Sequence, residues 1–394
     1  MQRSTEGHAV GRLWVAVFVA AFGTNVPTPL LLIYRDELGL SSNALTGAFG
    51  VYAAGLVPAL LLAGPASDRY GRRALVLPVV VLSVATSLLF LGAGWSVSLL
   101  FLCRFLQGAV SGVVFSVGTA WLAELIREPA RSARLTTAAL GGGWALGPLS
   151  AGLLAQWAPA PTVLPYLVHV VLTLVSLVLL PAVPETLAPA DRRAGAVLNL
   201  GVPAGSRWAF WLVVLPVAVG VFTFPSTAVT VLPLLLTPAV PQLAVVVTGL
   251  VAGVTLLTGV FTQPLGRRLG AVRGGPTGLA IGAAGFGLSL VAVQFQAWPL
   301  LVPVALLLGT AYGLCLAAGL TMVGVLASPT ARGALTGTFY ACAYLGFGVP
   351  LLLSLAGGDG GFTTPLAELA VLIAIIAGVL ALPAARRLVT PTAS

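Results

Sequence analysis

GPASDRYGRR, residues 64–73, is a polar, glycine-punctuated stretch that lies between two long apolar runs. A worn copy, GVFTQPLGRR, occupies residues 259–268 between two further apolar runs. The glycines and the arginine pair keep their spacing in the copy, whereas Asp68 is replaced by Gln263. The simplest interpretation is a duplicated membrane protein whose two halves have diverged.

Composition assigns the chain to the membrane. Of its 394 residues, 58% are hydrophobic and 7% are charged, whereas soluble domains are about 25% charged. A helix needs roughly 20 apolar residues to cross the hydrocarbon core. We predict an all-α membrane protein with twelve transmembrane helices, near residues 12–34, 44–63, 74–94, 97–123, 135–157, 162–182, 208–232, 242–264, 275–295, 298–327, 333–356 and 364–385.

The distribution of arginine sets the predicted topology. A net charge of +9 would suggest a nucleic-acid partner in a soluble protein. With twelve helices, however, all of the 19 basic residues except Arg35 and Arg104 fall in segments on one side of the membrane. Cytoplasmic loops carry such an excess of arginine. We therefore expect both termini in the cytoplasm, a location in the plasma membrane, and no nucleic-acid partner.

A long polar stretch, residues 184–207, separates two sets of six apolar runs. It predicts an N-terminal six-helix bundle over residues 1–183 and a C-terminal one over 208–394, joined by a cytoplasmic loop. Two parallel repeats with a site at their interface are typical of secondary transporters. Further matches also support a duplication. Gly108 and Gly112 in the first half correspond to Gly309 and Gly313 in the second.

In these features the chain resembles the major facilitator superfamily. The family's signature between helices 2 and 3 is Gly, three residues, Asp-Arg, one residue, and Gly-Arg-Arg or Gly-Arg-Lys. Every one of those positions is met here. They are Gly64, Asp68, Arg69, Gly71, Arg72 and Arg73. The resemblance covers essentially the whole chain and implies two pseudo-symmetric six-helix bundles.

The resemblance also implies that this loop latches the two halves on the cytoplasmic side. Gly64 would let a helix end approach a neighbouring backbone, and Asp68 would sit against helix-terminal N–H groups. Glu124, at the predicted cytoplasmic end of helix 4, is a candidate partner for Arg72 or Arg73. The alternatives are that the arginines only anchor the topology and that Glu124 is a solvated carboxylate at a helix end.

Arg104 is the one formal charge predicted to lie well inside a helix. An intramembrane arginine costs at least about 2.5–3.5 kcal/mol, so it is a functional candidate that faces the bundle interior. Gln107 follows on the same helical face. The stretch RFLQG, from Arg104, resembles the family's helix 4 motif, whose arginine is associated with proton coupling. Relatives often pair it with a carboxylate on helix 1, where this chain offers only Thr24 and Asn25. A structural, hydrogen-bonding arginine is the alternative.

A second motif lies in helix 5. Residues 143–152, GWALGPLSAG, resemble the motif associated with antiporters and exporters in the superfamily, with alanine in place of one glycine. Glycines four residues apart also permit generic close packing between helices, which is the alternative. The matching positions are Gly143, Gly147, Pro148 and Gly152.

The group that carries a coupled proton is left open by the sequence. No carboxylate lies at mid-depth in a predicted helix, whereas His169 lies within helix 6, and histidine is the side chain whose ordinary pKa is near neutral. A neutral, hydrogen-bonded histidine is the alternative, and Glu368 and the peripheral acids are the other candidate carriers. Asn25 precedes two prolines that would free carbonyls toward a cavity. Tyr340 and Tyr344 are candidate aromatic walls, although packing also explains them.

The C-terminal half has lost its charged counterparts. Ala305 stands at the position that corresponds to Arg104, and Gln263 at that of Asp68. We therefore expect ion coupling and latching to reside mainly in the N-terminal half, and the C-terminal half to shape the substrate cavity.

Together these patterns predict a secondary active transporter that works by alternating access. It would export small apolar or amphiphilic compounds in exchange for protons. The expected partners are a small-molecule substrate, protons and the lipid bilayer. No cofactor, metal or enzymatic activity is expected. Two alternatives remain: an importer of a sugar or organic anion and, more remotely, a membrane-embedded enzyme or receptor.

Overall fold

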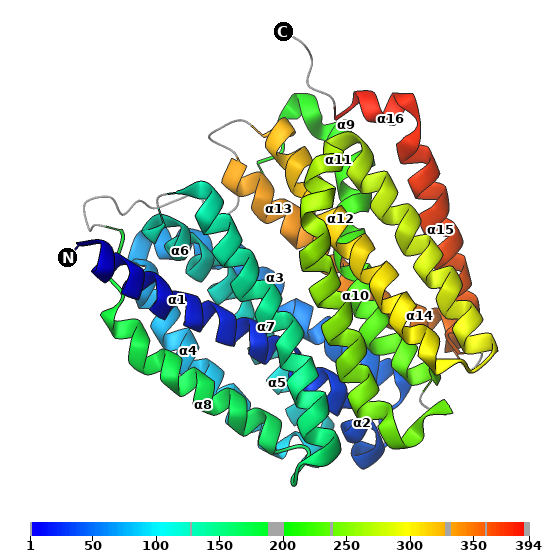
Figure 1. Cartoon of the computed structure of the whole chain (residues 1–394), viewed down its shortest axis with the longest axis horizontal. Helices are drawn as coiled ribbons and strands as arrows, with labels where there is room; N and C mark the ends of the chain where they lie inside the picture. Colours follow the sequence, from blue (N-terminus) through cyan, green and yellow to red (C-terminus); the bar gives the residue numbers. More distant parts are fainter. Residues whose placement is uncertain are drawn as a thin grey trace. The chain divides into compact units, whose positions relative to one another are not determined.

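The computed structural model describes residues 2–126, 128–187, 201–236, 239–327, 332–358 and 361–389. In this part of the chain all regular secondary structure is helical (Figure 1). The chain divides into two compact units, residues 1–198 and 199–394. The predicted central loop, 184–207, lies largely outside the described residues, which end at 187 and resume at 201.

Each unit is built from long apolar helices and a few short ones. The N-terminal unit contains α1 (Gln2–Asn25), α2 (Pro27–Leu38), α3 (Ser42–Tyr70), α4 (Arg72–Leu89), α5 (Val97–Val113), α6 (Thr119–Leu125), α7 (Pro129–Trp157) and α8 (Leu164–Leu179). The C-terminal unit contains α9 (Arg207–Ala209), α10 (Leu215–Leu236), α11 (Ala244–Gln294), α12 (Leu301–Leu326), α13 (Arg332–Tyr344), α14 (Val349–Gly357), α15 (Thr363–Ala381) and α16 (Pro383–Arg387).

The described residues contain eleven segments that are long and apolar enough to cross a membrane. One of them, 241–294, runs for 54 residues, and inside it Gly270 has φ 70° and ψ −172° and breaks the helix. Since roughly 20 residues suffice for one crossing, this segment holds two passes. The structure therefore agrees with the twelve predicted helices, although the gap expected between residues 264 and 275 is a single break at Gly270.

The first predicted helix, 12–34, is two helices in the structure. α1 ends at Asn25, and α2 begins at Pro27. Proline has no N–H, so Pro27 cannot donate to the carbonyl of Gly23, its partner in a continuous helix. The Val26 N–H approaches that oxygen instead, at a long 3.4 Å. The Gly23 carbonyl is thereby left open to a side chain from another helix.

The four glycines that supported a duplication have the same packing role in both units. A Cβ added at Gly108 or Gly112 of α5 would lie 2.0 or 2.4 Å from backbone oxygens of α3. A Cβ added at Gly309 or Gly313 of α12 would lie 2.4 or 2.2 Å from backbone oxygens of α11. Figure 1 shows α11 and α12 running side by side. Each unit is therefore held at one helix pair by backbones too close for any side chain.

This packing makes a stability prediction. Gly108→Ala places a methyl group against a backbone oxygen and should destabilise the protein by about 1–3 kcal/mol, as overpacking does. The measurement is the thermal unfolding midpoint in detergent. Gly287→Ala is the matched control, because an added Cβ meets nothing within 4 Å there. That change should be neutral or slightly stabilising, and equal destabilisation by both variants would contradict the close contact.

Candidate functional site

The turn between α3 and α4 is fixed by a single glycine. α3 ends at Tyr70 and α4 begins at Arg72, and Gly71 between them has φ 98° and ψ 158°. A residue with a Cβ is strained at this φ, whereas glycine is not. The Gly71 N–H donates to the Ser67 carbonyl at 2.9 Å and closes the end of α3. The turn consequently brings the last turn of α3 and the first residues of α4 together.

Arg72 is the centre of an ionic cluster at this turn. Its Nη1 lies 2.7 Å from Asp68 Oδ1, and its Nη2 lies 2.7 Å from Glu124 Oε1. It also donates to the Ser67 hydroxyl. The planar guanidinium can serve several acceptors at once, which an ammonium group does less well. Glu124 thus pairs with Arg72, while Arg73 donates to the Val183 carbonyl instead.

Glu185, just after the last helix of the unit, caps the N-terminus of α4. Its carboxylate accepts from the N–H of Arg72 at 3.1 Å and from that of Arg73 at 2.9 Å. The expectation that Asp68 would occupy this position is wrong. Asp68 is still helical, one turn before Arg72, and its carboxylate pairs with the Arg72 side chain. The first N–H groups of α4 have no partner inside the helix. They are satisfied by Glu185, which lies near the C-terminal end of the unit in the sequence.

The environment of Glu185 favours its charged form. Burial raises the pKa of the carboxyl group, but backbone N–H donors from Arg73, Arg72, Leu187 and Thr186 outweigh burial and hold the pKa below its ordinary value. A carboxylate at a helix N-terminus is also stabilised by the helix dipole.

Two signature residues are less involved in this cluster than the sequence suggested. A Cβ added at Gly64 would meet only Ser116 Oγ, at 3.6 Å, so the expected approach to a neighbouring backbone is absent. Arg69 is exposed, and its guanidinium lies 5.4 Å from the centre of the Tyr70 ring.

Arg104 lies in the middle of α5 with 1% of its surface exposed. Its Nη1 donates to Gln107 Oε1 at 2.6 Å and to the Thr24 carbonyl at 3.4 Å, and its Nε donates to the Ala48 carbonyl at 3.2 Å. Among the described residues, no carboxylate lies within salt-bridge distance of it. All of these acceptors are neutral, so the positive charge is hydrogen-bonded but has no counter-ion there.

Two aromatic rings of α3 complete the surroundings of Arg104. The guanidinium carbon lies 5.1 Å from the centre of the Phe49 ring and 4.9 Å from that of Tyr52. Ring faces carry partial negative charge and attract cations. The rings therefore offset part of the cost of burying the charge.

Gln107 connects Arg104 with α1. While its Oε1 accepts from Arg104, its Nε2 donates to the Gly23 carbonyl at 2.6 Å. This is the carbonyl that Pro27 leaves without its helical donor. The sequence NVPTP at residues 25–29 thus provides the acceptor that orients Gln107.

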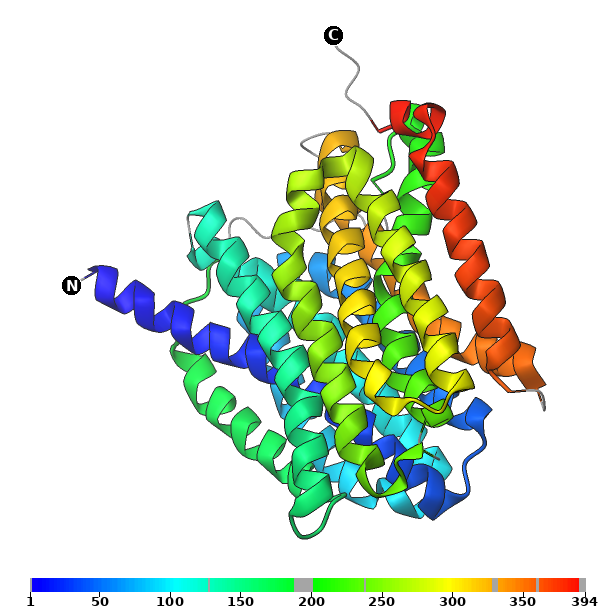
Figure 2. The same cartoon turned by 45° about the vertical axis from the view of Figure 1, so that its right-hand side comes forward.

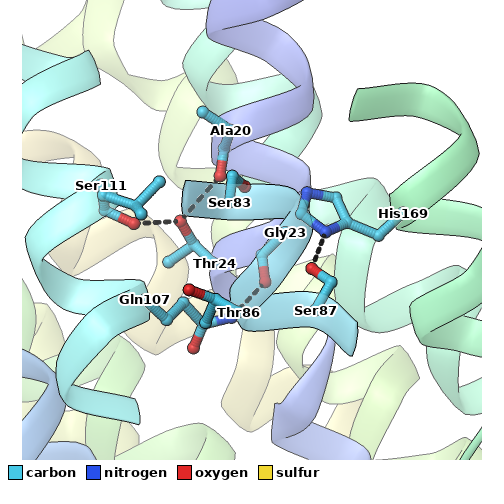
Figure 3. Close-up of a pocket in the computed structure, with 10 residues that line it drawn as sticks. Ala20, Gly23, Thr24, Ser83, Thr86, Ser87, Gln107, Ser111 and His169 are labelled. Carbon is cyan, nitrogen blue, oxygen red and sulfur yellow. Dashed lines mark hydrogen bonds between the residues drawn. The ribbon is translucent and has the colours of Figure 1, made fainter. Parts of the chain in front are cut away.

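His169 of α8 is buried against α1 and α4 (Figure 3). Its Nδ1 lies 2.7 Å from Ser87 Oγ, and its Nε2 lies 3.2 Å from the Val19 carbonyl oxygen. A carbonyl can only accept, so Nε2 carries a hydrogen. In the neutral ring Nδ1 then accepts from the Ser87 hydroxyl. A Cβ at Gly23 would lie 2.2 Å from Nε2, so this glycine makes room for the ring.

A small polar cavity adjoins His169 (Figure 3). Its volume is about 10 Å³, which is near the minimum that holds one water molecule. Thr24 and Ser111, which line it, are hydrogen-bonded to each other at 3.1 Å. The other polar side chains of its wall are Ser83, Thr86, Ser87, Gln107 and His169. The cavity therefore brings the His169 group and the Gln107–Arg104 group into one site.

The helix 5 motif borders this site through α1. A Cβ at Gly143 or Gly147 would lie 2.4 or 2.1 Å from backbone oxygens of α1, so the motif packs α7 directly on that helix. Pro148 and Gly152 are buried in α7. Asn25, a candidate cavity residue, donates to the Trp144 carbonyl at 3.4 Å rather than to the Arg104 group.

Tyr340 and Tyr344 belong to α13 of the C-terminal unit. The Tyr344 ring stacks on Phe222 of α10, with 4.6 Å between the ring centres. Phe222 also stacks on Tyr312 of α12 at 5.9 Å. The Tyr312 hydroxyl is buried and has no hydrogen-bond partner among the described residues. The interior of this unit therefore contains an aromatic cluster, whereas the interior of the N-terminal unit contains the charged Arg104.

Sequence reasoning missed three of these contributors. Glu185 falls in the predicted central loop, and its only signal is that it is an acid directly after an apolar run. Ser87 was one hydroxyl among several in apolar helices and carried no signal. Phe222 looked like an ordinary apolar residue of a membrane helix.

Comparison with known proteins agrees with this architecture. A family model described as Major Facilitator Superfamily matches residues 13–273. A POT family transporter solved in complex with 5-aminolevulinic acid has a TM-score of 0.76 at 14% identity, covering 94% of this chain and 95% of that chain. The human organic anion transporter MFSD10 has a TM-score of 0.62 at 18% identity, covering 95% and 99%. At such identities the likeness shows the fold.

Curated relatives match shorter parts of the chain. A triacylglyceride transporter of Mycolicibacterium hassiacum is 30% identical over 192 residues, 45% of this chain and 34% of that protein. Multidrug resistance protein MdtL of Escherichia coli O157:H7 is 34% identical over 96 residues, 24% of each. Multidrug resistance protein 1 of Bacillus subtilis is 27% identical over 142 residues, 36% of each. The chain thus spans between a quarter and about a third of the length of these relatives.

The α4 cap makes a pH-dependent stability prediction. Glu185→Gln removes the charge at the helix N-terminus and should destabilise the protein by about 1 kcal/mol near neutral pH. Because the folded protein lowers the Glu185 pKa, this contribution is present above the ordinary carboxyl pKa and is lost as the pH falls through the folded value.

Unfolding midpoints in detergent of the original protein and the variant should therefore converge as the pH falls below about 4. Glu128→Gln is the control for the helix dipole alone, since this exposed acid precedes α7 but makes no side-chain hydrogen bond to its N–H groups, and its effect should be smaller. A difference between the original protein and Glu185→Gln that persists unchanged in acid would contradict the capping role.

Proposed function

We propose that this chain, which belongs to the major facilitator superfamily, is a proton-coupled exporter of small apolar or amphiphilic compounds that works by alternating access. Family membership makes it a multi-pass membrane transporter. Export is supported by the multidrug resistance relatives and by the helix 5 motif at 143–152. We place it in the cell membrane with both termini in the cytoplasm, on the basis of its arginine distribution. The proposed domains are the bundles at 1–183 and 208–394.

The observation that carries this proposal is the polar site inside the N-terminal unit. Arg104 is buried and its acceptors among the described residues are all neutral, while His169 is buried beside a cavity of about one water molecule. Ionisable residues inside membrane helices are costly and mark ion or substrate pathways. Packing alone would be served as well by apolar residues at both positions.

His169 is the group that we assign to proton loading. Of the described residues that line the cavity, none is a carboxylate and His169 is the only base. A proton added at Nδ1 turns that atom into a donor to Ser87 Oγ, and the Ser87 hydroxyl hydrogen rotates toward the cavity. The Nε2 contact with Val19 is unchanged. The charged and neutral rings therefore fit the same contacts.

Arg104 and Gln107 are the partners through which this proton would act. The His169 ring contacts Gly23, while Arg104 and Gln107 bind the carbonyls of Thr24 and Gly23. Protonated His169 would place a second positive charge on the other side of this short segment of α1. Like charges at close range disfavour each other, so protonation would weaken the present arrangement of Arg104.

The cluster at the α3–α4 turn is the proposed gate. Asp68, Arg72 and Glu124 are joined by ion pairs within the N-terminal unit. The duplicated turn at 259–268 has no acid at the position of Asp68.

Asp68→Asn should slow substrate turnover several-fold at unchanged expression, since one of the two ion pairs of Arg72 is lost. Unchanged turnover would show that Asp68 is not part of the gate.

Proton coupling is tested in proteoliposomes with a fluorescent lipophilic substrate. An imposed proton gradient should accelerate export by the original protein. His169→Gln, which keeps a donor for the Val19 carbonyl, should bind substrate but lose this acceleration. His8→Gln, which changes the chain's other histidine at an exposed position, should behave like the original protein. Transport that ignores the gradient in the original protein would refute proton coupling itself.

Transport of an organic anion is the second candidate, and the lack of a described counter-ion at Arg104 favours it. Arg104→Gln should reduce transport at least about tenfold in either case, because hydrogen bonds to charged groups contribute about 1.5–3 kcal/mol. The two functions differ in binding. If Arg104 holds an anionic substrate, the variant loses affinity for anions, whereas affinity for a neutral lipophilic compound is kept. Full activity of the variant would reduce Arg104 to a structural role.

A further inference from the structure

A groove on the C-terminal unit is lined by α11 from Leu269 into its second pass, by α15 and by Arg386 of α16. Figure 2 shows α15, in red, beside the yellow half of α11 in this unit. The groove has a volume of about 540 Å³. Its wall consists mainly of small residues, among them Ala280, Ala283, Ala374, Ala377 and Gly378. Small side chains on both helices leave a channel in an otherwise close contact.

One end of the groove is basic. Arg273, at the start of the second pass of α11, and Arg386, in α16, both line it, and no acidic residue in the described part of the chain does. Arg273 is exposed. The Arg386 Nε is buried and has no hydrogen-bond partner among the described residues. A buried guanidinium N–H without an acceptor is costly, so an acceptor bound beside Arg386 Nε would stabilise the groove.

We propose that this groove binds an anionic phospholipid. An acyl chain would lie along the alanine-rich wall, and the phosphate would accept from Arg273 and from the unpartnered Nε of Arg386. Phosphate oxygens form strong, charge-assisted bonds with guanidinium groups. Basic pockets between membrane helices on the cytoplasmic side are suited to acidic lipid headgroups. The arginine-rich side of this chain is the one assigned to the cytoplasm. This proposal does not depend on the direction or coupling of transport.

Charge complementarity distinguishes this lipid from other occupants. A zwitterionic lipid would fill the same apolar channel, but its positive headgroup would face two arginines. A second copy of the chain would need an acidic surface, and the chain has only ten acidic residues in all. An anionic lipid satisfies both the apolar wall and the basic end.

The test uses the full-length protein, purified in detergent and titrated with phosphatidylglycerol or phosphatidylcholine. Phosphatidylglycerol should raise the thermal unfolding midpoint and stay bound in native mass spectrometry, whereas phosphatidylcholine should do neither at the same concentration. The double variant Arg273→Ala, Arg386→Ala should weaken phosphatidylglycerol binding at least about tenfold. Arg267→Ala, Arg268→Ala is the control, because these exposed arginines lie on α11 outside the groove.

Several results would overturn the proposal. These are equal binding of the two lipids to the original protein, unchanged phosphatidylglycerol binding by the groove variant, or an equal loss in the control variant. Concentration-dependent dimers without retained lipid would assign the groove to a second copy instead. If the double arginine variant does not fold, Ala280→Phe fills the channel and keeps both arginines. It should also displace the lipid, and retention of lipid by that variant would contradict the assignment.

Discussion

The carbonyl of Gly23 is the point on which the polar interior of the N-terminal unit depends. In a hydrocarbon environment, polar backbone groups must find partners within the protein. Pro27 removes the N–H that would have satisfied this oxygen, and Gln107 replaces it at 2.6 Å. Gln107 is thereby held in the orientation that accepts from Arg104. The same glycine, having no side chain, admits the His169 ring. One residue of α1 thus organises both ionisable groups.

Comparison of the two units shows that helix packing is preserved after the duplication, whereas the buried polar residues are not. The close helix contacts at Gly108 and Gly309 are equivalent, because no other residue fits against a neighbouring backbone at 2.0–2.4 Å. The buried contents are not equivalent. Ala305 and Leu308 are fully buried at the positions of Arg104 and Gln107. Packing constraints act on both copies, whereas a buried charge is needed in only one of them.

Much of this organisation follows from the sequence, because it depends on local patterns. Apolar run lengths predict the helices, and the glycine spacing predicts the close contacts. The depth of Arg104 follows from its place in an apolar run. The sequence limits the partner of Glu124 to two arginines, and in the structure its carboxylate pairs with Arg72 at 2.7 Å.

What the sequence does not predict are contacts between residues far apart in the chain. Glu185 meets Arg72 across more than a hundred residues, and Ser87 meets His169 across more than eighty. These contacts arise from how helices pack, and a single sequence carries no direct record of that. Gly64 illustrates the reverse error. Its signature position suggests a close backbone approach, but a Cβ added there would meet only the Ser116 hydroxyl, at 3.6 Å.

The lack of a carboxylate among the described partners of Arg104 changes how a proton can act in such a site. Where an arginine is paired with an acid, protonation of the acid neutralises the partner and releases the arginine. Here the described acceptors of Arg104 are neutral, and a proton on His169 adds charge instead of removing it. Coupling in this chain would then work by repulsion across the Gly23–Thr24 segment. The repulsion between protonated His169 and Arg104 is relieved when either group becomes hydrated or pairs with an anion. The charged state would therefore favour the conformation in which the polar site is most open.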